Sequence, residues 1–193
     1  MREIIQDALD RHLRVAEELA ASFTERIEAV AGTLLECYRS GGKVLVMGNG
    51  GSAADAQHFA AELVGRYARE RAALPAIALT TDTSILTAVA NDYGYNDVFR
   101  RQVEAHTKPG DVVVGISTSG NSENVCRALE TAHARGATTI ALGGGDGGRM
   151  KALADLSLIV PVKETARVQE AHITIIHILC DLVERSMAAH DAR

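Results

Sequence analysis

Residues 43–62 read KVLVMGNGGSAADAQHFAAE, and this stretch decides the fold. The apolar run at 43–48 predicts a buried strand, and the glycines after it predict a tight turn into a helix from about Ser52 to Tyr67. Similar apolar runs at the ranges 76–80, 111–117, 138–143 and 156–161 predict four more strands, with helical patterns between them. Apolar strands that alternate with helices indicate an α/β fold, a doubly wound parallel five-stranded sheet with helices on both faces.

Long helical patterns lie outside this alternating region. Residues 2–21 and 24–40 have helical periodicity, as do about twenty residues from Arg167 onward. We therefore expect one domain over 1–193, with N-terminal helices in 1–40, an α/β core in 43–161 and a C-terminal helix in 167–190. One sheet has limited room for two further long apolar helices, so we expect part of their apolar surface to contact another subunit. This predicts a homo-oligomer.

Composition excludes several classes of function. The chain has 193 residues, 47% of them hydrophobic, and a net charge of −5, so it has material for one core and lacks the basic surface of a nucleic-acid-binding protein. Its apolar runs are too short to span a membrane, and the charged N-terminus has no signal-peptide core. Cys37, Cys126 and Cys180 are far apart in apolar contexts, which predicts reduced core thiols in a cytoplasmic protein.

Two polar turns follow predicted strands. Residues 48–52 are GNGGS and residues 117–122 are STSGNS, and each runs directly into a helix. Free backbone N–H groups and the helix dipole make such turns suited to a phosphate monoester, although ordinary turns with good N-caps look similar. Neither turn has the lysine of G-x-x-x-x-G-K-[ST], and GNGGSA departs from G-x-G-x-x-G. A small phosphorylated metabolite is favoured over a nucleotide.

Polar residues on the helices are further candidates. His58 and Glu62 lie about 40° apart around a helix axis, which suits a metal clamp or a base with its orienting partner, and equally a solvated pair. His177 lies among isoleucines, where a histidine bonded to a core carbonyl is the alternative. Gln169 is eight residues earlier, about 12 Å along an ideal helix. His172 points elsewhere on that helix and is predicted to be structural.

Together these segments resemble the sugar isomerase (SIS) domain and, within it, the phosphoheptose isomerases of bacterial heptose synthesis. The resemblance covers nearly the whole chain, through GNGGSAADAQHFAAEL, LPAIALTTDTSILTAVANDYGYND, GDVVVGISTSGNS, DGG and ARVQEAHITIIHIL. It implies a homotetramer with active sites at subunit interfaces. It also implies interconversion of sedoheptulose 7-phosphate and D-glycero-D-manno-heptose 7-phosphate through an enediol, the first step of ADP- or GDP-heptose synthesis.

The resemblance also implies roles for individual residues. Glu62 matches the family's base and His177 its acid. One zinc ion per site would be bound by His58, Glu62, Gln169 and His177. Substrate contacts would come from Asn49, Gly50, Gly51, Ser52, Glu62, Asn91, Asp92 and Gln169, and phosphate contacts from Ser117, Thr118, Ser119 and Ser122. The chain departs from the family at Ala166, where some members have an aspartate, and at Gly143, where a threonine is frequent.

Two other functions share part of this pattern. A non-catalytic SIS protein that binds the replication initiator as a tetramer has the same glycine turn, but such proteins typically lack the glutamate and the last histidine. Glu62 and His177 therefore favour the enzyme. A sugar-phosphate-sensing regulatory domain usually accompanies a DNA-binding module, for which we expect no room in 193 residues.

Overall fold

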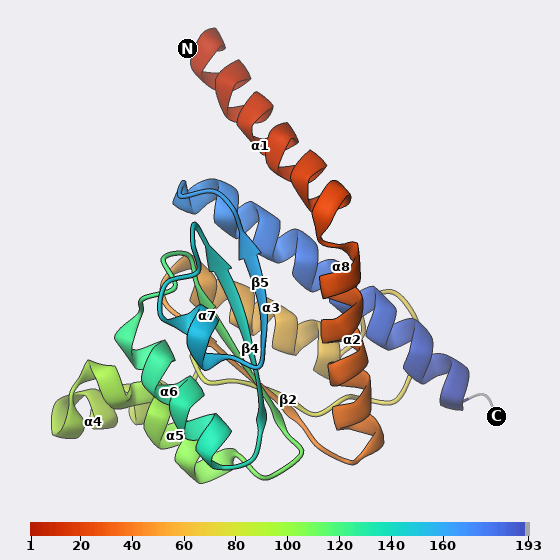
Figure 1. Ribbon diagram of the computed structural model, residues 1–193. Coiled ribbons are helices and arrows are strands. Elements are labelled where there is room, and N and C mark those ends of the chain that lie inside the picture. The colour runs from red at the N-terminus through yellow and green to blue at the C-terminus, as the bar shows by residue number, and fades with distance from the viewer. Residues whose placement is uncertain (192–193) are drawn as a thin grey trace.

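A parallel five-stranded sheet forms the centre of the computed structural model, which describes the backbone of residues 1–191 and the side chains of residues 1–188 (Figure 1). The strand order is β2-β1-β3-β4-β5, and all four pairings are parallel. The strands are β1 (Val44–Gly48), β2 (Ala76–Ala78), β3 (Val112–Ser117), β4 (Thr138–Gly144) and β5 (Leu156–Val160). The predicted doubly wound parallel sheet is confirmed.

Helices cover both faces of this sheet. One face carries α2 (Thr24–Arg39), α3 (Gly51–Val64) and α8 (Thr165–Asp191), while the other carries α5 (Val98–His106), α6 (Glu123–Ala134) and α7 (Met150–Leu153). The remaining helices are α1 (Arg2–Ser22), α4 (Thr83–Tyr93) and the 3-10 turn η1 (Tyr95–Asp97). Alternate β1 residues serve the two cores: Val44 and Val46 pack toward α2, α3 and α8, whereas Leu45 and Met47 pack on the opposite face.

The amino-terminal part of helix α1 projects beyond the rest of the chain (Figure 1), whereas Ala8 and His12 of this helix bond residues of α8. Only Val15 and Leu19 of this helix are buried, whereas Leu9 is 54% and Leu13 57% exposed. Among residues 1–191, no helix combines the length and the apolar character that crossing a bilayer requires. The three cysteines are buried free thiols, as predicted, and burial raises the pKa of Cys37 to about 11.

Three predicted boundaries were wrong. Helix α3 ends at Val64 and not at Tyr67, because the backbone N–H groups of Tyr67 and the next two residues donate to a side chain of α8. Strand β2 ends at Ala78 and not at residue 80, since this edge strand pairs only with Val44–Val46 of β1. Helix α8 is longer than expected and runs from Thr165 to Asp191.

Candidate functional site

The two polar turns meet at the carboxyl ends of β1 and β3, where the strand order of the sheet reverses. In open α/β sheets this is where ligands bind. A pocket of about 290 Å³ lies there, and it is lined by Asn49, Gly50, Gly51, Ser52, Ile116, Ser117, Thr118, Ser119, Ser122, Thr165 and Gln169. Ten of these eleven residues come from the two turns and the start of α8, so the structure brings most of the predicted substrate contacts together.

Backbone geometry explains the glycines of the first turn. Gly50 has a φ of 55°, in the left-handed region that glycine tolerates best. A β-carbon at position 51 would overlap the amide of Gln169, so Gly51 lets α8 approach the start of α3. The start of α3 and the side chain of Gln169 therefore line the same pocket.

Hydroxyl groups line the second turn. Ser117 is buried, and its Oγ lies 2.9 Å from Ser122 Oγ and 3.4 Å from Ser119 Oγ. Ser119 Oγ also accepts a hydrogen bond from the backbone N–H of Asn121 at 3.2 Å. These hydroxyls, together with the start of α6, provide neutral donors for an anion without a lysine in the pocket lining.

A pair of asparagines joins the two turns, which the sequence did not reveal. Asn49 and buried Asn124 exchange side-chain amide hydrogen bonds of 3.0 and 2.9 Å. The hydroxyl of Tyr95 donates to Asn49 Oδ1 at 3.2 Å. The side chain of Asn49 is thus held by α6 and η1.

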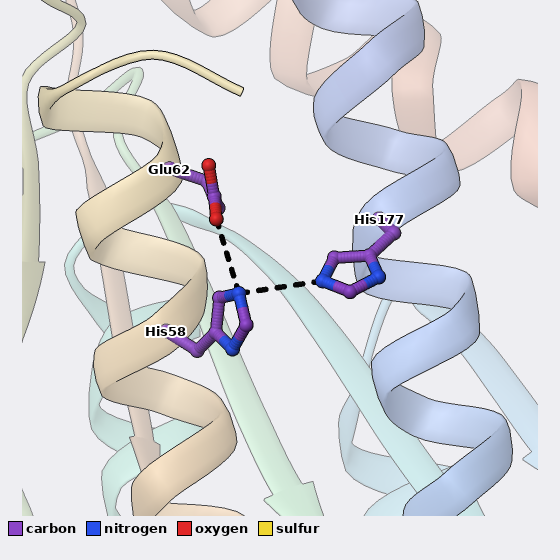
Figure 2. A group of neighbouring side chains, drawn as sticks. All are labelled: His58, Glu62 and His177. Carbon is purple, nitrogen blue, oxygen red and sulfur yellow. Dashed lines mark hydrogen bonds and ion pairs between the residues drawn. The ribbon is translucent and has the colours of Figure 1, made fainter. Parts of the chain in front are cut away.

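A second cluster lies further along α3 and α8, which pack against each other. Figure 2 shows His58 and Glu62 on α3 facing His177 on α8. His58 Nε2 lies 3.0 Å from Glu62 Oε1 and 3.3 Å from His177 Nε2. His177 is half-buried and contacts His58, so the alternative of a core histidine bonded to a carbonyl does not describe it. The imidazole and the carboxylate, far apart in sequence, face the same space.

The cluster fits a metal ion by the chemistry of its donors. One ligand atom from each of His58, Glu62 and His177 lies within 4.8 Å of the others. Two imidazoles and a carboxylate are ligands that Zn²⁺ binds in proteins. Gln169, the fourth ligand implied by the resemblance, lies two turns before His177. It contacts Gly51 in the pocket at the carboxyl ends of β1 and β3.

Two predicted substrate contacts lie apart from the pocket in this single chain. Asn91 and Asp92 are exposed near the end of α4, and Asn91 donates its side-chain amide to Asp92 at 2.8 Å. Neither residue belongs to the pocket lining, so their contact with substrate stays a prediction.

His172 is the structural residue that its position on the helix predicted. It is fully buried, and its Nε2–H donates to the main-chain oxygen of Gly143 in β4 at 3.1 Å. Burial lowers its pKa to about 4, with the bond to Gly143 opposing that effect. His172 therefore fixes α8 on the sheet between the two functional parts of that helix.

Other residues near the cluster escaped the sequence analysis. The ring of Tyr67 lies 5.6 Å, centroid to centroid, from that of His177. Asp55 is one turn before His58 on α3, and burial raises the pKa of its carboxyl group, with His58 opposing. The helical spacing of Asp55 was a usable signal, whereas nothing local in the sequence places Tyr67 beside His177.

Comparison with known proteins agrees with this geometry. The SIS domain family matches residues 9–144. A phosphoheptose isomerase of a Geobacter species is 60% identical over 97% of this chain and 97% of its own length, and that of Citrifermentans bemidjiense is 60% identical over 95% of each.

Solved structures show the same relationship. The phosphoheptose isomerase GmhA from Neisseria gonorrhoeae is 47% identical, with a TM-score of 0.91 over 95% of this chain and 98% of that one. The phosphoheptose isomerase from Francisella tularensis is 39% identical, with a TM-score of 0.92 over 95% and 97%. Identity, coverage and fold agree along almost the entire chain. The chain therefore belongs to the SIS domain family and, within it, to the phosphoheptose isomerases.

Proposed function

We propose that this isomerase converts sedoheptulose 7-phosphate into D-glycero-D-manno-heptose 7-phosphate in the cytoplasm, as the first step of ADP- or GDP-heptose synthesis. One observation carries the proposal: Glu62 and His177 face a common space on α3 and α8, two to three helical turns from a pocket suited to phosphate. The names of the relatives support the substrate class. Residues 1–193 would act as one SIS domain.

The pocket would hold the phosphate end of the sugar. The hydroxyls of Ser117, Thr118, Ser119 and Ser122 and the N–H groups at the starts of α3 and α6 would donate hydrogen bonds to the ester. The glycine turn at Asn49, Gly50, Gly51 and Ser52, with Gln169, would contact the sugar chain, and Asn91 and Asp92 remain further candidates. Binding energy from the phosphate would then orient the reacting carbons.

The proton transfers are assigned to Glu62 and His177. The Glu62 carboxylate would take a proton from C1 of the ketose while His177 gives one to the oxygen on C2, which yields a cis-enediol. Glu62 would then return its proton to C2 while His177 takes the hydroxyl proton from the oxygen on C1, so C1 becomes the aldehyde and both residues regain their starting protonation. General acid–base groups contribute typically 10²–10⁴-fold to such steps. A residue pair close enough to serve two neighbouring atoms is what this reaction needs.

The donor set also supports one zinc ion per site. His58, Glu62 and His177 would hold it, and the amide of Gln169 would complete the set. When bound, zinc supplies charge stabilisation at a sugar oxygen. Because a carboxylate bound to zinc is a weaker base, Glu62 would have to be free of that bond when it accepts the proton.

Exposed apolar surface supports a homotetramer with active sites at subunit interfaces. An apolar groove of about 540 Å³ lies between α1, α2 and α8, and Ile178 and Leu182 line it while remaining 40% and 37% exposed. The same two residues line a hollow that includes His177. A neighbouring subunit placed in the groove would therefore lie beside the acid–base pair.

The direct test is incubation of the purified protein with sedoheptulose 7-phosphate and detection of the aldose by NMR. Product formation at a rate proportional to enzyme, and its loss in Glu62→Gln, would support the proposal. A protein that is folded, metal-loaded and inactive toward this ketose would refute it. The non-catalytic alternative has no observation in its favour, since Glu62 and His177 are both present and close together.

A further inference from the structure

Residues 65–75, between α3 and β2, contain neither helix nor strand, yet they are firmly bonded to α8. The carboxylate of Glu184 accepts the backbone N–H groups of Tyr67 at 2.8 Å, Ala68 at 2.8 Å and Arg69 at 2.6 Å. Glu184 is fully buried. Three consecutive N–H groups that converge on one carboxylate form a cradle for an anion, here supplied by the chain itself.

Arg71 completes this arrangement from the other side. Its Nη2 donates to the main-chain oxygen of Glu62 at 2.8 Å, and its Nη1 donates to that of Gly65 at 3.2 Å. An arginine that bonds the last carbonyls of a helix satisfies acceptors that the helix leaves open. Arg71 Nε lies 3.7 Å from Glu184 Oε2, and both side chains are buried. The carboxyl end of α3 is therefore linked to α8 through an ion pair without solvent.

Glu184 stays charged in this position. Burial alone raises its pKa, but the N–H donors of residues 67–69 and the charge of Arg71 outweigh burial and hold the pKa below its usual value. The two buried charges thus require each other, because an unpaired buried charge is strongly unfavourable. The pair consequently favours one separation between the two helices.

The linked helices carry the acid–base pair. Arg71 bonds the backbone of Glu62 itself, while Glu184 is two turns after His177 and so on the same side of α8. The segment that Glu184 holds places the ring of Tyr67 against His177. We propose that Arg71 and Glu184 are positioning residues, which set the separation between Glu62 and His177. This inference rests on the isomerase function and on the roles assigned above to Glu62 and His177.

The test is a double-mutant cycle on kcat. Glu184→Gln keeps the shape of the side chain, removes the charge and leaves one fewer acceptor for the N–H groups. We expect kcat to fall about tenfold, since small displacements of reacting groups are costly. KM should change less than twofold, because Gln169 of the phosphate pocket lies about four turns of α8 before Glu184. In a Glu62→Gln background the same substitution should leave kcat unchanged, since the residue through which Glu184 acts is already disabled.

Asp111→Asn is the matched control. Asp111 is also buried and accepts two backbone N–H groups, from Lys43 at 3.0 Å and Lys108 at 2.8 Å. It directly precedes β3, so it lies at the amino ends of the strands, whereas the site lies at their carboxyl ends. If Asp111→Asn lowers kcat only because less protein is folded, kcat should fall by the same factor with Glu62 present and in the Glu62→Gln background. The inference would be overturned if Glu184→Gln lowered kcat by the same factor with Glu62 present and in the Glu62→Gln background. It would also be overturned if Glu184→Gln did not lower kcat at all.

A second variant covers the case in which Glu184→Gln does not fold. Tyr67→Leu retains the backbone N–H, and the side chain is 37% exposed, so folding is not at stake. Tyr67→Leu should lower kcat in the otherwise unchanged protein and should not change kcat in a His177→Ala background. If kcat fell by the same factor in both backgrounds, the inference would again be overturned. Absence of isomerase activity in the unsubstituted protein would instead refute the proposed function.

Discussion

Buried His172 should make the stability of this protein depend on pH. Its imidazole bonds Gly143 through Nε2, and among the described residues Nδ1 has no hydrogen-bond partner. Burial disfavours the imidazolium, which would carry a second N–H at Nδ1, and lowers the pKa from 6.5 to about 4. The unfolded chain binds a proton there more readily than the folded one. The contribution of His172 to the free energy of unfolding is therefore fully present above pH 6.5 and is lost as the pH falls toward 4.

The magnitude follows from the pKa difference. A tenfold change in a protonation equilibrium corresponds to about 1.4 kcal/mol, so a fall from 6.5 to about 4 is worth about 3 kcal/mol in unfolding free energy. A folded protein of this size has a total of about 5–15 kcal/mol. The loss on acidification should therefore be large enough to measure by urea denaturation.

The measurement compares the unsubstituted protein with His172→Gln. Glutamine can donate to Gly143 through its amide but does not titrate, whereas all other ionisable groups are common to both proteins. Urea unfolding is followed by circular dichroism between pH 7.5 and 4 at constant protein concentration. The unsubstituted protein should lose about 3 kcal/mol more than the variant over this range. Equal losses in the two proteins would refute the reasoning that burial keeps His172 neutral.

Four further outcomes are expected. Glu62→Gln and His177→Ala should each lower kcat by about a hundredfold or more without changing the oligomer, and near-normal turnover in either would remove the proposed mechanism. Ser119→Ala should mainly raise KM for the 7-phosphate sugar, so an unchanged KM would count against the hydroxyl turn as the phosphate site. Metal analysis after gentle purification should find about one zinc per chain, and full activity in strong chelator would make the ion dispensable. Leu9→Glu should yield particles smaller than a tetramer in light scattering, because a charge on the exposed face of α1 opposes apolar contact; an unchanged mass would exclude that face from the interface.

Part of the site followed from local patterns. The apolar strands predicted a parallel sheet, and parallel strands present their carboxyl ends at one edge, which is where the turns GNGGS and STSGNS lie. The spacing of His58 and Glu62 on one helix predicted that their side chains would be neighbours, which the structure confirms. These conclusions depend only on the periods of strands and helices.

Tertiary packing decided the rest. His177 could equally have been a core histidine, and only the packing of α8 on α3 brings it to His58 across 119 residues of sequence. The same packing placed Gln169 against Gly51 and ended α3 at Val64, because Glu184 took the N–H groups that a longer helix would have used.

The sequence by itself therefore determined the layers of the fold, the two polar turns and the His58–Glu62 pair. Only the tertiary structure decided which imidazole completes that pair and which buried charges hold it. The physical reason is range: backbone periodicity acts over a few residues, whereas a contact between two helices depends on how all the intervening segments pack.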